Sequence, residues 1–160
     1  MIRQSSGIFL IAVIIGLAVN QLHPNKLPLV ANWSLEARLT LESGESMVIP
    51  IEEARELFLS QSAIFLDARS SKLYEHGHIL RARNLPWNAV DEHFDTVMAD
   101  IHHDALLIAY CDGESCAEGK YLALELFYRG YENVRVLVNG WSLWVEQHLP
   151  VEKGSWQGES

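Results

Sequence analysis

Between residues 47 and 150, short apolar runs alternate with stretches whose apolar residues recur at helical spacing. The runs predicted as strands are 47–49, 64–66, 82–85, 106–110 and 134–138. The stretches predicted as helices are 51–59, 73–77, 90–98, 117–128 and 140–147. Short apolar strands that alternate with helices are typical of a mostly parallel sheet with helices on both faces. The pattern therefore predicts an α/β domain of about 100 residues, with about five strands.

One of these helices has a regular apolar face. Ala117, Tyr121, Leu124 and Tyr128 recur at i, i+4, i+7 and i+11, which predicts that they share the buried side. Gly130 follows in the position where helices commonly end.

The most apolar stretch lies at the N-terminus. No charged or ionisable side chain occurs from Gln4 to Leu22, and residues 7–19 are apolar throughout. As a helix, the uncharged stretch would span about 28 Å, close to the roughly 30 Å of a bilayer's hydrocarbon core. The strictly apolar part also has the length of a signal-peptide core, and residues 16–18 form a small-x-small cleavage site. We expect residues 1–22 to form an uncleaved membrane anchor, in preference to a cleaved signal or a core helix.

Two further segments flank the predicted domain. Residues 23–46 contain Pro24, Pro28 and the turn-like residues 42–46, so we expect a linker. Residues 151–160 are expected to be a tail. With the anchor in place, the domain over 47–150 would face the periplasm or the exterior; a cleaved N-terminus would leave it secreted or periplasmic.

Composition narrows the class of function. The formal net charge of -9 argues against a broad basic face for nucleic acid. The two cysteines exclude a disulfide scaffold and a four-cysteine zinc site. The seven histidines are scattered apart from His102 and His103, whose side chains point apart on a regular element. We therefore expect no metal site.

The chemistry concentrates at Cys111, between a strand and the start of a helix. Backbone N–H groups and the positive helix terminus at such a place stabilise a thiolate or persulfide anion. The polar residues that follow, Asp112, Gly113, Glu114 and Ser115, are unsuited to a core and suit an anion-binding loop. A buried, inert thiol is the alternative for Cys111.

Several motifs occur in a fixed order along the same region. They are FLDAR at 65–69, YEHGHI at 74–79, Ala82, NLP at 84–86, the loop after Cys111, GYENV at 130–134 and NGWSLW at 139–144. In this order the sequence, from about Val48 to Leu149, resembles the rhodanese-like sulfurtransferase family. The resemblance implies the rhodanese-like fold, a persulfide on Cys111 and no cofactor. It also implies that Asp67-x-Arg69 and Gly77-His78-Ile79 are structural signatures near the site.

The loop departs from the family's usual Cys-x-x-Gly-x-Arg, whose arginine helps to bind an anionic sulfur donor. Here Gly113 comes two residues after Cys111, and Cys116 stands where the arginine would be. A glycine that usually follows the Gly-His-Ile motif is also replaced, by Leu80-Arg81. Thiosulfate is therefore a doubtful donor, and the chain resembles a branch with a Cys-x4-Cys loop.

Three roles remain open for Cys116. It could resolve a persulfide or sulfenate on Cys111, form a structural disulfide with it, or take no part in chemistry. Asp67 and Arg69, two residues apart after a strand, are expected to form an ion pair that orders the loop. His78 is expected to be a structural histidine with satisfied hydrogen bonds.

The sequence thus predicts a membrane-tethered sulfurtransferase that passes sulfane sulfur through Cys111 to a thiol acceptor. Its substrates would be thiols or persulfides, either small molecules or groups on a partner protein. Two alternatives remain open. One is a non-catalytic rhodanese-like module that binds a membrane partner. The other is a thiol–disulfide redox protein that uses Cys111 and Cys116.

Overall fold

The computed structural model describes residues 12, 14–16, 19–22, 39–40, 44–113 and 117–155. The chain divides into two units, 1–33 and 34–160. In the first unit, every described residue is helical. No helix among the described residues is long and apolar enough to cross a membrane. Most of the predicted anchor, most of the predicted linker and the loop residues Glu114, Ser115 and Cys116 lie outside the described residues.

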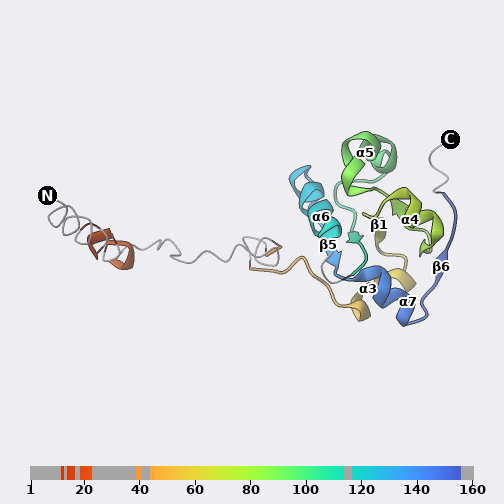
Figure 1. The fold of residues 1–160 in the computed structure, drawn as a ribbon, viewed down its shortest axis with the longest axis horizontal. Coiled ribbons are helices and arrows are strands. Elements are labelled where there is room, and N and C mark those ends of the chain that lie inside the picture. Colours follow the sequence, from red (N-terminus) through yellow and green to blue (C-terminus); the bar gives the residue numbers. More distant parts are fainter. Residues whose placement is uncertain are drawn as a thin grey trace, which may run out of the picture. The chain divides into compact units, whose positions relative to one another are not determined.

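The second unit is built on a four-stranded parallel sheet (Figure 1). Its strands are β1 (Ile64–Asp67), β3 (Arg83–Asn84), β4 (Leu107–Tyr110) and β5 (Val134–Leu137), in the order β3-β1-β4-β5. A separate antiparallel pair joins β2 (His78–Ile79) to β6 (Val151–Glu152). The predicted parallel sheet is confirmed. The strand predicted at 47–49 is reduced to a single bridge between Val48 and Val136.

Helices cover both faces of the sheet, as predicted. Their bounds are α3 (Ile51–Leu59), α4 (Ser71–His76), the 3-10 turn η1 (Trp87–Ala89), α5 (Val90–Met98), α6 (Glu118–Tyr128) and α7 (Gly140–Glu146). Alternate strand residues serve the two faces. Leu107 and Ala109 pack in the core cluster that contains α5 and α6 residues. Ile108 and Tyr110 pack in the cluster that contains α3, α4 and α7 residues. We call these the α6 face and the α7 face.

The buried side of α6 differs from the predicted one. Tyr121 and Tyr128 are 37% and 74% exposed, so they do not belong to a buried stripe. The residues of α6 that are buried instead include Gly119, Leu122, Ala123 and Leu126. Tyr121 instead stacks on Trp87 of η1, with ring centroids 5.5 Å apart. The helix is confirmed, and Leu124 of the predicted face is buried, but Tyr121 and Tyr128 lie outside the buried side.

The folded domain extends beyond residues 47–150 at both ends, and its buried core extends at the N-terminal end. Leu39, within the range expected as a linker, is completely buried, and the Met47 amide donates to its carbonyl at 2.7 Å. At the other end, Val151 and Glu152 of the expected tail form β6.

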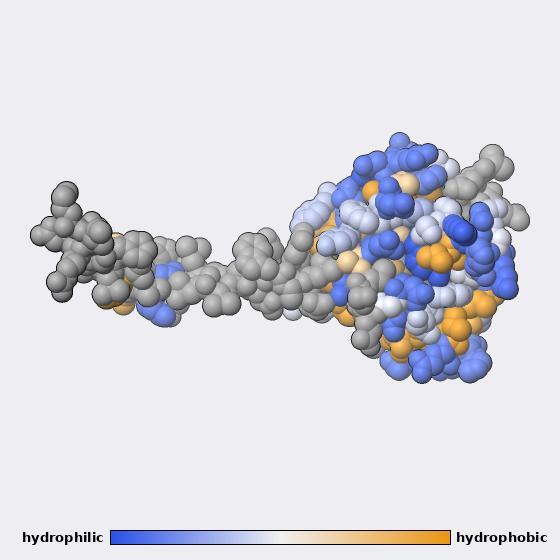
Figure 2. All heavy atoms as spheres, viewed as in Figure 1, coloured by the Kyte–Doolittle hydropathy of each residue, from blue (hydrophilic) through white to orange (hydrophobic). Residues whose placement is uncertain are grey.

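On the face shown in Figure 2, apolar residues form separate small groups among hydrophilic ones.

Candidate functional site

The carboxyl end of β1 carries a buried ion pair. Asp67 is completely buried and Arg69 is 3% exposed. The Arg69 Nε donates to both Asp67 carboxylate oxygens at 2.9 and 3.1 Å, and its Nη2 donates to Oδ2 at 2.5 Å. The Arg69 amide also donates to Asp67 Oδ1 at 3.0 Å. The two residues therefore form the predicted pair, and the carboxylate also binds the backbone of the turn that follows the strand.

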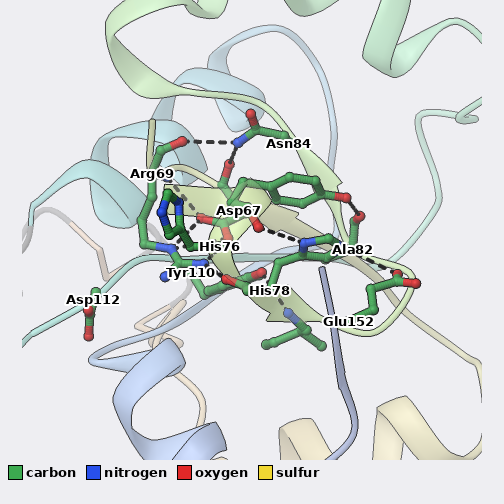
Figure 3. Close-up of polar contacts among 12 residues, drawn as sticks. Asp67, Arg69, His76, His78, Ala82, Asn84, Tyr110, Asp112 and Glu152 are labelled. Carbon is green, nitrogen blue, oxygen red and sulfur yellow. Dashed lines mark hydrogen bonds and ion pairs between the residues drawn. The ribbon is translucent and has the colours of Figure 1, made fainter. Parts of the chain in front are cut away.

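This pair connects segments that lie far apart in the sequence (Figure 3). The Arg69 Nη2 donates to the Gly77 carbonyl at 2.8 Å, which fixes the end of α4. The Arg69 guanidinium lies over the Trp141 ring, 4.5 Å from its centroid, which fixes the start of α7. The Asn84 side chain donates to the carbonyls of Asp67 and Arg69 at 3.1 and 3.0 Å. The Asp67–Arg69 pair is thus a structural centre, as expected.

Tyr110, the residue before Cys111, belongs to the same network. Its hydroxyl accepts from the Ile79 amide at 3.2 Å and is hydrogen-bonded to Asp67. Burial and the neighbouring negative charge of Asp67 raise the pKa of Tyr110 well above its ordinary value. The phenol therefore keeps its proton, which it can donate to the Asp67 carboxylate. For Arg69, burial opposes the charged form, but Asp67 outweighs it and raises the pKa.

His78 is satisfied on both ring nitrogens, in line with its expected structural role. Its Nδ1 donates to the Tyr74 carbonyl at 2.8 Å, and its Nε2 lies 3.3 Å from Glu152 Oε1. The ring stacks on Tyr74, with centroids 3.5 Å apart. His78 therefore holds α4 and β6 together.

Cys111 comes directly after β4 and belongs to the other face of the sheet. Its residue is 3% exposed and packs in the core cluster of the α6 face, whereas Tyr110 packs in that of the α7 face. Asp67 and Arg69 contact Tyr110 on the α7 face. Cys111 and the Asp67–Arg69 pair therefore lie on different faces of the sheet.

The start of α6 lies directly against the backbone at Cys111. A Cβ atom added to Gly119 would lie 3.0 Å from the Tyr110 carbonyl carbon and 3.2 Å from the Cys111 nitrogen. Only a residue without a side chain allows this approach. The N-terminus of an eleven-residue helix therefore follows the Cys111 loop (residues 111–117) closely, as expected from the sequence.

The first turn of α7 holds the first half of this loop, which the sequence did not predict. The Trp141 amide donates to the Cys111 carbonyl at 3.1 Å. The Ser142 hydroxyl donates to Asp112 Oδ1 at 2.5 Å, and the Gly113 amide donates to Asn139 Oδ1 at 2.9 Å. Asn139 has φ +54°, a left-handed conformation that asparagine tolerates better than most residues.

Cys111 is disulfide-bonded in this structure. The chain contains one other cysteine, Cys116, which lies outside the described residues, as do Glu114 and Ser115. Their predicted roles, as a resolving cysteine and as anion-binding loop residues, stay predictions. Among the residues that the structure describes, no group of His, Cys, Asp and Glu side chains could hold a metal ion.

Comparisons with known proteins agree with this architecture. Residues 51–147 match the family model described as the Rhodanese-like domain. YnjE, a thiosulfate sulfurtransferase of Escherichia coli, is 36% identical over 72 residues, which are 43% of this chain and 16% of that protein. The chain thus spans a small part of that relative. GlpE, a thiosulfate sulfurtransferase of Pseudomonas putida, is 29% identical over 96 residues, covering 60% of this chain and 82% of the relative.

Solved structures show the same fold at lower identity. The BH2092 protein of Bacillus halodurans has a TM-score of 0.57 at 23% identity, and the match covers 64% of this chain and 74% of that one. The human single-domain sulfurtransferase TSTD1 has a TM-score of 0.56 at 19% identity, over 64% of this chain and 98% of that one.

The buried ion pair yields a stability prediction. Asp67→Asn leaves the buried Arg69 charge without its counter-ion and should lower the free energy of unfolding by about 3 kcal/mol. Chemical denaturation of the full chain measures this change. Replacing both partners, as Asp67→Leu with Arg69→Met, should recover much of the loss, because no buried charge then remains.

The matched control is Asp100→Asn, which breaks the exposed Arg83–Asp100 pair. Solvent screens that pair, so its loss should leave the unfolding midpoint almost unchanged. If Asp67→Asn is as mild as Asp100→Asn, the structural role given to the buried pair is wrong.

Proposed function

The chain belongs to the rhodanese-like domain family, and we propose that it is a sulfurtransferase in which Cys111 carries the transferred sulfur. The observation that carries this proposal is the position of Cys111. It directly follows the buried strand β4, and Gly119 brings the first turn of α6 within van der Waals distance of its backbone. A helix N-terminus and the amides of the intervening loop favour a sulfur anion at that point. The family's sulfurtransferase relatives at low identity support the same reaction class.

The proposed reaction has two displacement steps. The Cys111 thiolate attacks the outer sulfur of a persulfide donor, R–S–S⁻. A new S–S bond forms on Cys111, and the donor leaves as the thiolate R–S⁻. An acceptor thiolate R′–S⁻ then attacks the outer sulfur of the Cys111 persulfide, so that R′–S–S⁻ forms and the Cys111 thiolate returns. Each step breaks one S–S bond and forms one, so the transfer needs no oxidant or reductant. This covalent catalysis needs no cofactor.

The disulfide on Cys111 sets a condition on this cycle. A disulfide sulfur is not a nucleophile, so two equivalents of a thiol must first reduce it, with formation of the corresponding thiol disulfide. The same observation favours a second candidate, a thiol–disulfide redox protein. In that case the oxidised chain takes two electrons from two substrate thiols, which become a disulfide, while Cys111 and Cys116 become thiols.

We propose further that the donor is a neutral or carrier-bound sulfane sulfur rather than thiosulfate. Residues 112–118 contain Asp112, Glu114 and Glu118 and no basic residue. The cation that follows β1, Arg69, is committed to Asp67 and Gly77 through Nε and Nη2. A bound dianion such as thiosulfate is stabilised by a cation fixed close to it and is repelled by nearby carboxylates. The acidic loop therefore disfavours thiosulfate.

The location of the protein is a separate proposal, which rests on the uncharged residues 4–22. We propose that residues 1–22 tether the chain to a membrane, with the domain on the periplasmic or outer side. The length and apolarity of this stretch in the sequence support the tether. A thiol-bearing partner at the membrane would then serve as the sulfur acceptor.

Three predictions follow from these proposals, and the first of them identifies the nucleophile. After reduction and incubation with a low-molecular-weight persulfide, intact mass should show the gain of one sulfur on the wild-type chain. Cys111→Ser should abolish the gain, and Cys116→Ser should retain it, because Cys111 directly follows β4. Labelling that survives in Cys111→Ser and vanishes in Cys116→Ser would reverse the assignment. A loss of two hydrogens without a gain of sulfur supports the redox protein, and no change supports the binding module.

The second prediction concerns the donor. The kcat/KM of the reduced chain should be at least tenfold higher for a low-molecular-weight persulfide than for thiosulfate. Cys116→Arg, which places a cation at the end of the loop, should raise the value for thiosulfate selectively. Cys116→Ser is the control for the loss of the thiol. Preference of the wild type for thiosulfate, or no response to the arginine, would contradict the electrostatic argument.

The third prediction tests the tether. The full chain should sediment with membranes after cell lysis, and a protease added from the non-cytoplasmic side should cleave its domain. A variant with two leucines of the uncharged stretch, Leu10 and Leu17, changed to Arg should lose membrane association. Recovery of the wild-type chain in the cytosolic fraction would contradict the proposal.

A further inference from the structure

The side chains of Asn139 and Ser142 do not take part in the sulfur chemistry proposed above, yet both contact the Cys111 loop. Ser142 binds the Asp112 carboxylate, and Asn139 binds the Gly113 amide. Between them, the Trp141 amide binds the Cys111 carbonyl. Three consecutive loop residues are therefore attached to one turn, at the start of α7.

The Asp112 contact has an electrostatic consequence for the neighbouring sulfur. A carboxylate next to a reacting cysteine disfavours the thiolate and the persulfide anion, because like charges repel. Asp112 is exposed and would be free to approach the sulfur if nothing held it. Its bond to Ser142 draws the carboxylate toward α7, where its charge also acts on Arg69. Figure 3 draws Asp112 to one side of the Asp67–Arg69 cluster.

We propose that Ser142 and Asn139 are positioning residues that hold the Asp112 charge away from the Cys111 sulfur. Ser142 anchors the carboxylate directly. Asn139 anchors the next peptide unit, so that the Asp112 backbone cannot rotate the side chain back. The inference rests on the proposed role of Cys111, because it concerns the reactivity of that thiol.

The conformation of Asn139 explains why this anchor is possible at all. Its φ of +54° lies in the left-handed region, which glycine fills without strain. Asparagine accepts this conformation and adds an oxygen that reaches the Gly113 amide. Asn139→Gly therefore removes the hydrogen bond to the Gly113 amide while glycine keeps the left-handed backbone without strain. Any effect of this variant can then be assigned to the lost side-chain contact.

Other charges near Cys111 set the background against which this effect is measured. They are Glu118 and Lys120 at the start of α6, Asp67 at the end of β1 and Arg69 just after it. Glu114 lies outside the described residues. None of these groups changes in the variants at residues 139 and 142. A shift that depends on Asp112 alone can therefore be assigned to Asp112.

The test measures the reactivity of Cys111 without a sulfur donor. The full chain carries Cys116→Ser, so that one thiol remains, and iodoacetamide alkylation rates are recorded across pH, with ultraviolet thiolate absorbance beside them. Ser142→Ala and Asn139→Gly should each raise the pKa of the Cys111 thiol by about half a unit, which lowers the alkylation rate below that pKa about threefold. In an Asp112→Asn background, neither substitution should shift the pKa.

Gln61→Gly is the matched control for Asn139→Gly, because Gln61 also has φ +54° and lies before β1. It should leave the alkylation profile unchanged. The proposal is overturned if Ser142→Ala leaves the thiol pKa unchanged, or if the shifts persist without the Asp112 charge. Because no sulfur is transferred in this assay, a failure of the proposed sulfurtransferase activity would not affect its outcome.

Discussion

The buried ion pair between Asp67 and Arg69 is the interaction on which the arrangement of the site depends. Its carboxylate accepts bonds from Arg69 and contacts the Tyr110 hydroxyl, while the guanidinium reaches Gly77 and Trp141. One pair thus connects the ends of β1 and β4 with α4 and α7. Burying two charges is costly unless every donor and acceptor finds a partner. The network around the pair meets that condition among the described residues, where no buried side-chain nitrogen or oxygen is unsatisfied.

Because strand residues alternate between faces, this ion pair and Cys111 lie on opposite sides of the sheet. Tyr110 points to the ion pair, and Cys111, the next residue, packs on the α6 face. Under the proposed function, the ion pair that stabilises the fold is therefore separate from the sulfur that meets the substrate. We propose that the loop's own residues, the start of α6 and the anchors on α7 set the reactivity of the sulfur.

The sequence predicted the parts of the fold that depend on local pattern. The bounds of α3 and α5 and the end of β1 at Asp67 follow from apolar runs and their breaks. The position of Cys111 follows from its place between a strand and a helix, and the pairing of Asp67 with Arg69 follows from their two-residue spacing after an apolar run. The buried side of α6 was missed because Tyr121 stacks on Trp87 instead of entering the core, a tertiary contact that spacing does not reveal. The anchors Asn139 and Ser142 were missed for a similar reason, since they act on residues about thirty positions away. The signal in the sequence is the asparagine directly before Gly140, because asparagine tolerates the left-handed conformation better than most residues.

The most direct test of the central claim is a single-turnover transfer experiment. The reduced chain is loaded with one labelled sulfane sulfur, freed of excess donor, and mixed with a thiol acceptor. We predict that the label lies on the proteolytic peptide that contains Cys111, on Cys111 itself, and passes to the acceptor in a one-to-one ratio. A label that remains on the protein, or that resides on any other residue, would contradict the account.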